Sequence, residues 1–343
     1  MISTDKNIFN KESAVAKRQV EYAKGYEEVH IIIFTKKDSA KRKDTVKEEK
    51  EKFIETSIGS NIWVYPTYSI SKWFYVFDAL KLGRFIVVKK GITNITCQDP
   101  FETGLVGALI RNRHKIRLEL QIHTDIGSPY FRDFSFLNRT RFFISKYTLT
   151  RADTVRVVSE RIKDYVKKYI DESKIEVRPI SIDIEKIKNT VITVDLHKKY
   201  SQFSSIVLIV SRLEKEKNID MALRAFEIVL GKIPKAGLVI VGSGNEETRL
   251  KNLSRNMGVE SSIIFESYQN NLDILYSYYK SCDCFLLTSW YEGYGMALVE
   301  AHTAGCRIVS TDVGVARELG TFIVDYDTNE IAGKIVELIE NNY

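Results

Sequence analysis

Residues 284–301 read CFLLTSWYEGYGMALVEA, and this stretch decides the fold class because a strand, a turn and a helix follow one another directly. The apolar run 284–288 has the length of a buried strand, and the pattern over residues 296–304 has the length of a short helix. Gly293 and Gly295 between them allow a tight turn. A strand that leads at once into a helix is typical of a parallel sheet covered by helices.

The same alternation of apolar runs and helical patterns extends over the whole chain. We expect strands at residues 30–35, 62–65, 92–97, 118–123, 154–158 and 175–179, and then at 206–211, 238–241, 262–265, 284–288, 307–310 and 322–324. Helices are expected at residues 13–24, 135–150, 219–230, 246–257, 271–281, 296–304 and 329–342. Because the pattern occurs twice, we predict an α/β protein with two doubly wound, Rossmann-like domains, residues 1–179 and 180–343, that face a cleft.

Composition excludes several classes of protein. The chain has 343 residues, of which 44% are hydrophobic and 28% charged, as expected of a folded, water-soluble protein. It has no apolar run of about 18 residues, the length of a membrane span, and its start lacks the apolar core of a signal peptide. The four cysteines show no CxxC spacing and only five histidines are present, which argues against a disulfide framework and a zinc site. We therefore expect a cytoplasmic protein without a bound metal.

Positive charge is concentrated in the first half of the chain. Residues 1–180 contain 34 Lys and Arg against 23 Asp and Glu, a balance of +11, whereas the remainder has a balance of −5. A basic half can meet nucleic acid, a phosphorylated ligand or an anionic membrane. The cations do not interleave with a recognisable nucleic-acid-binding module, so we expect no nucleic acid partner. In the Lys-rich run 36–52, Lys and Glu alternate, which favours a solvated helix or loop over a binding groove.

Two cations lie between a predicted strand and a predicted helix in the segment SRLEKEKN, residues 211–218. Arg212 follows the strand, and Lys217 precedes the helix. Cations beside a helix amino terminus suit a diphosphate, since side-chain charge and helix dipole act together. The alternative is that both cations simply pair with Glu214 and Glu216, and the segment alone leaves the two interpretations equally open.

Glycines and glutamates follow two further strands of the second half. Gly242 and Gly244 form a short turn after one strand, a pattern that is weak by itself. After the other strand, residues 293–295 can approach a ligand closely and present backbone amides to it. Glu292 stands before the helix, where it can accept hydrogen bonds from sugar hydroxyls, and Glu300 lies eight residues later, about two turns along one face. A solvated Glu300 is the ordinary alternative, but its neighbours are apolar, and a buried carboxylate needs partners.

Polar residues also follow two predicted strands of the first half. His123 ends the strand 118–123, and Asp125 lies two residues further. Asp99 and Glu102 follow the preceding strand within QDPFETG. Because α/β sheets bind ligands at the carboxyl ends of their strands, these side chains are candidates to contact a ligand in the cleft. A single histidine is more often structural, and for His123 both roles stay open.

The order and spacing of several motifs resemble a known family. The segments VSRLEKEKNIDMALRAF, IVGSGNEETRL and SWYEGYGMALVEA, with QDPFETG and ADTVRVVSE in the first half, are similar to the retaining family-4 glycosyltransferases of GT-B fold. The pair Glu292 and Glu300 with the intervening Gly-Tyr-Gly is the most specific element. The resemblance spans about residues 3–340 and implies a hexosyltransferase whose first domain binds the acceptor and whose second domain binds a nucleotide-sugar donor.

The resemblance also implies roles for individual residues. Arg212 and Lys217 would bind the donor diphosphate. Glu292 would orient the donor sugar, Glu300 would hold the ribose, and His123 would face the sugar from the first domain. Further candidates are, for the donor, Gly242, Gly244, Gly293, Tyr294, Gly295 and Met296, and, for the acceptor, Asp99, Glu102 and Asp125. The expected donor is a UDP-sugar or a GDP-sugar, with no cofactor and no metal, because protein cations take the leaving-group charge.

Three features depart from the family pattern. Only Met1, Ile2 and Ser3 remain of the first strand, and the loop at residues 10–14 has no glycine. The chain also stops at Tyr343 after one helix, where relatives often continue with a helix that crosses back to the first domain. The alternatives are therefore a catalytically inactive sugar-nucleotide-binding protein, or a nucleotide-sugar epimerase of the same architecture.

Aromatic residues beside cations mark two segments of the first domain. One combines the aromatic run 73–77 with Lys72, Lys81, Arg84, Lys89 and Lys90. The other combines the apolar run 142–144 with Arg132, Arg139, Arg141, Lys146 and Arg151. Such segments suit an anionic membrane surface, although a buried helix face rimmed by cations fits equally well. The membrane interpretation predicts a glycan or lipid-linked acceptor and peripheral contact with the inner face of the membrane.

Overall fold

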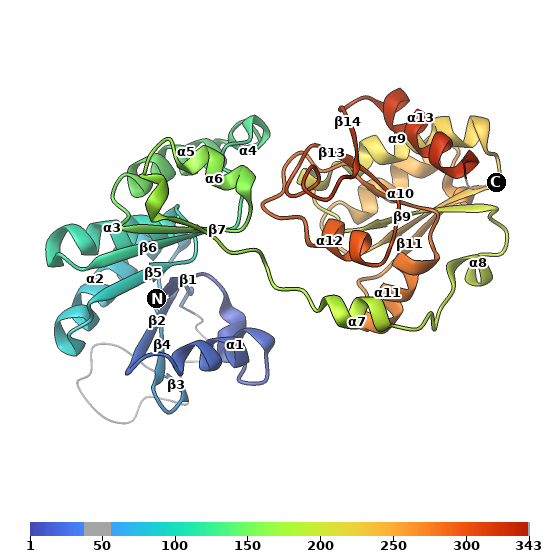
Figure 1. The fold of residues 1–343 in the computed structure, drawn as a ribbon. Coiled ribbons are helices and arrows are strands. Elements are labelled where there is room, and N and C mark those ends of the chain that lie inside the picture. The colour runs from blue at the N-terminus through green and yellow to red at the C-terminus, as the bar shows by residue number, and fades with distance from the viewer. Residues whose placement is uncertain (38–55, 342–343) are drawn as a thin grey trace. The chain divides into compact units, whose positions relative to one another are not determined.

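Two largely parallel β-sheets organise the chain in the computed structural model, which describes residues 1–37 and 56–341 (Figure 1). Contacts between residues divide the chain into a first unit, Met1–Val158 with Ile162–Arg178, and a second unit, Ser159–Arg161 with Pro179–Tyr343. The main division thus falls at residues 178/179, one residue before the expected boundary. The α/β class predicted from the sequence is confirmed.

The second unit contains a six-stranded parallel sheet in the order β11-β10-β9-β12-β13-β14. Its strands are β9 Ser205–Val210, β10 Ala236–Val241, β11 Ile263–Glu266, β12 Cys284–Leu287, β13 Ile308–Thr311 and β14 Phe322–Val324. The strand order reverses between β9 and β12, because the chain first proceeds outward through β10 and β11 and then returns to the other side of β9. Open α/β sheets bind ligands beyond the carboxyl ends of the strands at such a reversal.

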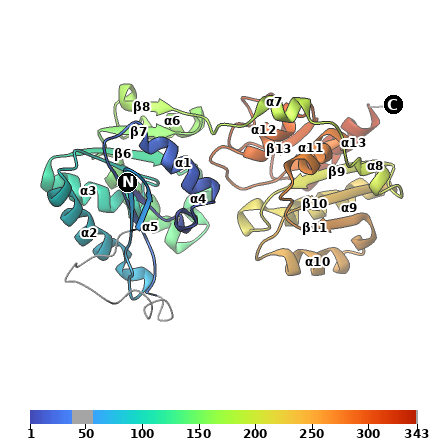
Figure 2. The same ribbon diagram turned by 90° about the horizontal axis from the view of Figure 1, so that it is seen from below.

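Helices cover both faces of this sheet (Figure 2). One layer consists of α9 Ile219–Lys232, α10 Glu247–Asn256 and α13 Thr328–Glu340, and the other of α7 Ile184–Asn189, α8 Leu196–Lys199, α11 Leu272–Ser281 and α12 Met296–Thr303. Alternate side chains of β9 point to opposite layers, as in any strand. Val207 and Ile209 pack with the first layer, and Ile206 and Leu208 pack with the second. Both faces of β9 are therefore buried, as is typical of a central parallel strand.

The first unit contains an eight-stranded sheet in the order β3-β4-β2-β1-β5-β6-β7-β8, where the β3–β4 pair is antiparallel and the other pairs are parallel. Its strands are β1 Ile2–Ser3, β2 Val29–Ile33, β3 Thr56–Gly59, β4 Ile62–Pro66, β5 Asn94–Cys97, β6 Arg117–Ile122, β7 Thr154–Val157 and β8 Ile175–Val177. The helices are α1 Ala14–Ala23, α2 Tyr75–Lys90, α3 Glu102–His114, α4 Pro129–Asp133, α5 Phe136–Leu149 and α6 Glu160–Val166. Short 3₁₀ helices occupy Lys6–Phe9, Lys72–Phe74 and Glu172–Lys174 in the first unit, and Lys215–Lys217 and Glu260–Ser262 in the second.

The amino terminus forms regular structure despite its short strand and its lack of glycine. Strand β1 has two residues and pairs with β2 on one side and β5 on the other. Helix α1 begins without a glycine because the Ser13 hydroxyl accepts a hydrogen bond from the Ala16 N–H at 3.0 Å, which caps the helix. Strand β3 was not expected, since its sequence Thr-Ser-Ile-Gly has one strongly apolar residue. Most of the Lys-rich run 36–52 lies outside the described residues.

No helix in the described parts of the chain is long and apolar enough to cross a membrane.

Substitution of Phe226 should destabilise the second unit. Its side chain is fully buried between α9 and the sheet, so Phe226→Ala should lower the free energy of unfolding by about 3–5 kcal/mol. Ile228→Ala on the same helix is the control, because Ile228 is 36% exposed and its loss should cost under about 1 kcal/mol. Hydrogen exchange of the β9 and β10 amides in urea measures both effects within this unit. Equal losses in the two variants would contradict the assignment of Phe226 to the core.

Candidate active site

The loops that follow β9 and β12 meet where the strand order of the second sheet reverses. The Trp290 N–H donates to the Glu216 carbonyl at 2.8 Å, and the Thr288 hydroxyl donates to the Asn218 carbonyl at 3.0 Å. Both bonds join the loop after one strand to the loop after its neighbour. The two loops that carry the strongest sequence motifs are thus held as one structure.

Lys217 and Glu292 form an ion pair at this junction. The Lys217 Nζ lies 2.5 Å from Glu292 Oε1, and the two side chains are only 13% and 14% exposed. The Ser289 hydroxyl donates a second hydrogen bond to the same carboxylate oxygen at 2.8 Å. Two charges removed from water in this way cost desolvation energy that their attraction only partly offsets. The Lys217–Glu292 pair therefore contributes little net stability to the fold.

Arg212 lies in the same loop but does not join the pair. Its side chain is 69% exposed, and its guanidinium contacts the Glu216 carboxylate at 2.7 Å. Glu214, the other acid of this loop, accepts hydrogen bonds from Asn245 and not from a cation of the loop. The alternative in which the cations of this loop pair with neighbouring acids therefore holds for Arg212 with Glu216, while Lys217 pairs with the more distant Glu292.

The glycine turn after β12 leads directly into α12. Gly295 has φ +88° and precedes Met296, the first residue of the helix, so a residue with a side chain would be strained there. The Tyr294 carbonyl accepts a hydrogen bond from the Val315 N–H at 3.0 Å, which fixes the turn. The Leu298 N–H donates to the Gly295 carbonyl at 2.9 Å, so the amides for which the helix supplies no carbonyl are those of Met296 and Ala297. Residues 292–295 are not helical, so the expected spacing of Glu292 and Glu300 by two helical turns is wrong.

Glu300 lies one turn into α12 and is held by a residue that the sequence did not single out. The Tyr279 hydroxyl, from the buried side of α11, donates a hydrogen bond to Glu300 Oε2 at 3.0 Å. Burial raises the pKa of Glu300, and the hydrogen bond from Tyr279 opposes that rise. Tyr279 lies in the segment YSYYK, which reads as an ordinary core helix and gave no signal of this contact.

Gly242 and Gly244 are required by the packing of two backbones. A side chain at Gly242 would come within 1.9 Å of the Ser211 carbonyl oxygen, and one at Gly244 within 2.3 Å of the Leu213 carbonyl oxygen. The Leu213 N–H also donates to the Ser243 carbonyl at 2.9 Å. The loop after β10 therefore lies directly against the loop that carries Arg212 and Lys217.

The candidates of the first unit lie beyond the carboxyl ends of β5 and β6, which are adjacent strands. Asp99 accepts a hydrogen bond from the Phe101 N–H at 2.8 Å at the start of α3, and Glu102 pairs with Arg141 at 2.9 Å. Asp125 accepts the Gly127 N–H at 3.0 Å within a turn. Each of these carboxylates thus has a local structural partner.

His123 reaches the surface directly after β6. The surrounding protein nevertheless removes enough water to lower the pKa of its imidazole, and the positive charges of Arg156 and Arg18 lower it further. The ring is therefore more readily neutral than an ordinary histidine, which suits hydrogen bonding to a neutral hydroxyl group.

Two more residues at the junction were missed by the sequence analysis. Ser289 directly follows β12 and could have been noticed as a polar residue at a strand end. Tyr326 stacks on Trp290 with ring centroids 4.5 Å apart, and its hydroxyl donates to the Ser289 carbonyl at 3.2 Å. Over the described ranges no three His, Cys, Asp or Glu side chains gather as metal ligands would.

Comparison with known protein families decides the class of the protein. The model described as Glycosyl transferases group 1 matches residues 197–342, and the model described as Glycosyltransferase Family 4 matches residues 21–186. The chain belongs to the group 1 glycosyltransferases. The resemblance seen in the sequence is thereby confirmed, and the chain is a glycosyltransferase enzyme.

Individual relatives of this glycosyltransferase are distant in sequence. An uncharacterized glycosyltransferase of Methanocaldococcus jannaschii is 29% identical over 284 residues, which cover 78% of this chain and 70% of the relative. Alpha-monoglucosyldiacylglycerol synthase of Streptococcus pneumoniae is 26% identical over 328 residues, which cover 86% of this chain and 73% of the relative.

Solved structures confirm the GT-B fold of this glycosyltransferase. Sucrose-phosphate synthase from Thermosynechococcus elongatus matches 99% of the chain, over 89% of its own, with a TM-score of 0.72 and 19% identity. HepE from Anabaena, solved in complex with UDP, matches with the same coverage, a TM-score of 0.68 and 18% identity.

Glu300→Gln tests the cost of burying this carboxylate in the glycosyltransferase. Burial raises the pKa of Glu300 above its ordinary value of 4.5, so the folded protein keeps this proton to a higher pH than the unfolded chain does. The contribution of the protonated Glu300 side chain to the free energy of unfolding is therefore fully present below pH 4.5, and it is lost as the pH rises through the raised pKa. Glu300→Gln keeps an acceptor for Tyr279, and its free energy of unfolding should therefore increase relative to wild type as the pH rises above 4.5.

Urea unfolding of the two proteins at a series of pH values from 4 to about 7 measures this difference. Glu227→Gln, at an exposed position of α9, is the matched control. A difference between Glu300→Gln and wild type that does not change with pH would contradict the prediction.

Proposed function

We propose that the chain transfers a hexose from a nucleoside-diphosphate sugar to a hydroxyl of a glycan or lipid-linked acceptor, with retention of the anomeric configuration. The observation that carries the proposal is the Lys217–Glu292 pair, which lies at the reversal of strand order and beside the amino terminus of α12. This arrangement combines a cation for phosphate, a carboxylate for sugar hydroxyls and helix amides in one place.

The donor diphosphate would be bound by Lys217, by the first amides of α12 and by Arg212. The exposed side chain of Arg212 can reorient, since a diphosphate competes with Glu216 for its guanidinium. The loop after β10 supports the Arg212 loop, since Gly242 and Gly244 pack against the Ser211 and Leu213 carbonyls and Asn245 hydrogen-bonds Glu214.

The sugar and the ribose would be bound by carboxylates. Glu292, oriented by Lys217 and Ser289, would accept hydrogen bonds from the hexose, next to the amides of residues 293–295. Glu300, oriented by Tyr279, would accept hydrogen bonds from the ribose. His123 of the first unit, whose pKa is lowered by burial, offers a neutral imidazole for a hydrogen bond to a substrate hydroxyl.

The reaction breaks the bond between C1 of the hexose and the phosphate oxygen, whose electron pair leaves with the diphosphate. The acceptor oxygen forms the new bond to C1 and gives up its proton, so the products are a glycoside and a nucleoside diphosphate. Negative charge develops on the leaving oxygen, and cations already in position stabilise that charge without reorganising. Lys217 and Arg212 supply this effect in the proposal, with Lys217 the better oriented of the two.

Related structures support a UDP-sugar as the first donor to test. HepE of Anabaena was solved with UDP. A trehalose-6-phosphate protein of E. coli, which matches this chain with a TM-score of 0.71, was solved with UDP-2-fluoro glucose. Both are under 25% identical to this chain, at 18% and 13%, so they support the choice of donor only through the shared fold. A GDP-sugar is the second candidate.

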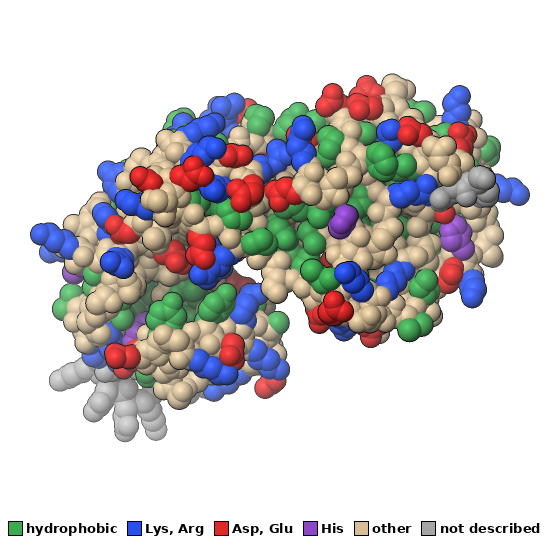
Figure 3. Space-filling model, viewed as in Figure 1, with side chains coloured by type: hydrophobic (Ala, Val, Ile, Leu, Met, Phe, Trp, Pro, Cys, Tyr) green, Lys and Arg blue, Asp and Glu red, His purple; other side chains and the backbone are tan. Residues whose placement is uncertain are grey.

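The first unit carries exposed aromatic side chains that fit a membrane-bound acceptor. Trp73 is 89% exposed and Phe77 is 69% exposed, which rules out the alternative that this part of the aromatic run is a buried helix face. In the second segment Phe136 is 85% exposed and Phe143 is 61% exposed. On the face shown in Figure 3, Lys and Arg side chains of the first unit stand among hydrophobic ones. Aromatic side chains between cations suit the headgroup region of an anionic membrane.

A glycolipid-forming relative supports the same choice of acceptor. The similar protein of Streptococcus pneumoniae is named alpha-monoglucosyldiacylglycerol synthase. We therefore propose that this glycosyltransferase works in the cytoplasm, at the inner face of the membrane, and contributes to the synthesis of a polysaccharide or glycolipid.

Lys217→Gln should weaken binding of the donor without changing the fold. Loss of a charged hydrogen bond to the diphosphate costs about 1.5–3 kcal/mol, which is roughly a tenfold to hundredfold loss of affinity. Thermal shifts with UDP, GDP, ADP and their sugar conjugates measure binding, and release of the free nucleotide measures turnover. Lys215→Gln is the control, because it removes the same charge two residues away at an exposed position.

The outcomes separate the three candidate functions. Nucleotide-selective stabilisation that is lost in Lys217→Gln, together with release of nucleoside diphosphate, supports transfer. Binding without release would indicate an inactive sugar-nucleotide-binding protein, and conversion of the sugar without release would indicate an epimerase. Equal loss in the Lys215→Gln control would contradict the assigned role of Lys217.

Removal of the exposed aromatic side chains should weaken membrane binding. The double variant Trp73→Ser and Phe77→Ser should bind vesicles that contain phosphatidylglycerol at least about tenfold more weakly than wild type does. Each of these exposed aromatic side chains would contribute about 1.5–3 kcal/mol when it becomes buried in the membrane. Tyr268→Ser, a 66% exposed aromatic of the second unit, is the control. Flotation at physiological salt measures binding, and a wild-type protein that ignores these vesicles would overturn the membrane proposal.

A further inference from the structure

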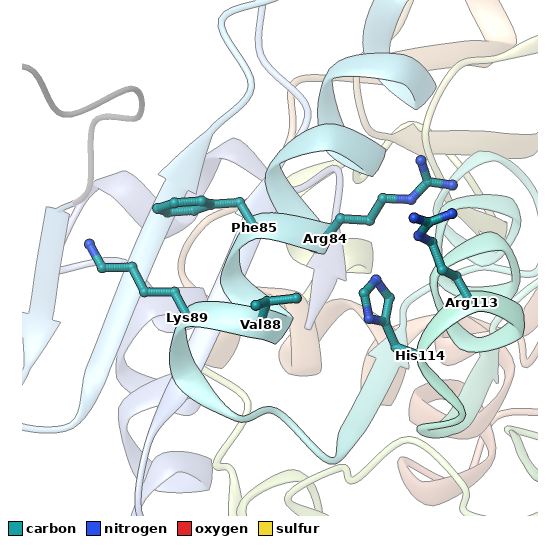
Figure 4. Close-up of a pocket in the computed structure, with 6 residues that line it drawn as sticks. All are labelled: Arg84, Phe85, Val88, Lys89, Arg113 and His114. Carbon is teal, nitrogen blue, oxygen red and sulfur yellow. The ribbon is translucent and has the colours of Figure 1, made fainter.

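A hollow of about 570 Å³ lies between the last turns of α2 and α3 in the first unit (Figure 4). Four of its lining residues come from α2 and two from the end of α3: Arg84, Phe85, Val88, Lys89, Arg113 and His114. The hollow therefore lies at the end of the same helix that carries Phe77 in its first turn. All six of its lining residues belong to the first unit, so the hollow is separate from the Lys217–Glu292 site.

Three nitrogen-bearing side chains converge in this hollow without an acidic partner. Arg84 and Arg113 direct their guanidinium groups toward one another, and the His114 ring points into the same space (Figure 4). Within residues 1–37 and 56–341, neither arginine forms an ion pair. Two like charges that face each other repel, and an anion bound between them would offset this repulsion.

Two nitrogen atoms of the hollow also lack hydrogen-bond partners. Arg84 Nε and His114 Nε2 are buried, and neither has a partner among the described residues. A buried polar atom without a hydrogen bond is unfavourable, so such atoms call for an explanation. An anion with several acceptor oxygens would satisfy both nitrogens and separate the two arginine charges.

The local backbone keeps the cations in place. Helix α2 ends at Lys90 before Gly91, and α3 ends at His114 before Lys115, so the carbonyl ends of both helices lie near the hollow. Positive charge is stabilised at a helix carboxyl terminus by the helix dipole. An anion here must therefore be bound by side-chain charge, and two planar guanidinium forks match the oxygen geometry of a phosphate group.

Apolar side chains beside the cations indicate that the phosphate carries hydrocarbon. Val88 is 70% exposed and Phe85 is 41% exposed, and both line the hollow. Phe77 lies eight and eleven residues before them, so the three share the exposed face of α2. The opposite face of α2 is buried through Leu82 and Ile86. The same face also carries Lys81 and Arg84, so it combines apolar side chains with cations, as suits the headgroup region of a membrane.

We propose that Arg84, Arg113 and His114 bind the phosphate group of a membrane phospholipid. Its acyl chains would pass along Phe85 and Val88 toward the exposed face of α2. The proposal rests on the membrane contact proposed above but is independent of glycosyl transfer. Without such a site, the first unit would be attracted to an anionic membrane only by its general positive charge. The proposed site would in addition recognise one chemical group of the lipid.

Selectivity between two anions at equal surface charge tests the proposal. Vesicles of phosphatidylcholine are prepared with phosphatidylglycerol, which carries phosphate, or with oleate, which carries carboxylate. Wild-type protein should prefer the phosphatidylglycerol vesicles over vesicles of the same zeta potential made with oleate by at least about fivefold. The double variant Arg84→Gln and Arg113→Gln should lose this preference.

A matched pair of variants separates a specific site from general electrostatic attraction. The double variant Lys72→Gln and Lys81→Gln removes the same charge from the same region, and it should weaken binding to both vesicles while the preference stays. Arg84→Lys with Arg113→Lys keeps both charges but loses the planar forks, and it should also lose the preference. This last variant keeps the test decisive if the glutamine variant unfolds.

Three outcomes would overturn the proposal. The first is an equal loss of the preference in the Arg84→Gln, Arg113→Gln variant and in the Lys72→Gln, Lys81→Gln variant, which would mean diffuse electrostatic attraction. The second is the absence of any preference in wild type. The third is arginine-dependent binding of soluble glycerol phosphate without any preference among vesicles, which would assign the hollow to a soluble ligand. Stabilisation of the same samples by UDP is recorded in parallel, so that failure of the donor site is seen separately.

Discussion

Parallel pairing of β9 with β10 on one side and β12 on the other determines where the chemistry of the second unit takes place. Side chains of β9 are buried on both faces of the sheet, so charged residues can stand only beyond its ends. Parallel strands end at the same edge, which brings the loops after β9, β10 and β12 together. The Lys217–Glu292 contact, the glycine packing at Gly242 and the start of α12 all follow from this single arrangement.

The fold could be predicted from the sequence because its strands are continuous apolar runs. A strand that is buried on both faces consists of consecutive apolar residues, which are easily recognised in a sequence. Strands β9, β10 and β12 were accordingly all expected near their observed positions. Strand β3 was missed because Thr-Ser-Ile-Gly contains one buried apolar residue and no run of them. Its backbone hydrogen bonds to β4 hold it in the sheet. Short strands of this kind depend on their partner more than on their own residues.

The sequence singled out several residues that meet at the reversal of strand order, but it did not reveal which of them contact one another. Lys217 and Glu292 were both candidates on their own loops, yet 75 positions separate them, and only the strand order brings them to 2.5 Å. Tyr279 was invisible because a buried tyrosine is an ordinary core residue until its hydroxyl finds an acceptor. Asp99 and Asp125 show a further contact that the sequence did not reveal, since one carboxylate oxygen of each accepts hydrogen bonds from nearby backbone amides.

Both sheets end in short strands, and this has a consequence for how the chain folds. Strand β8 and strand β14 have three residues each, and β3 and β11 have four. A parallel sheet pairs segments that are distant in sequence, so it forms slowly and leaves partly folded chains with unpaired backbone. An edge of only three or four residues offers a neighbouring chain few hydrogen bonds to copy. The short outer strands thus limit sheet-to-sheet aggregation of a nascent chain whose apolar inner strands have not yet paired.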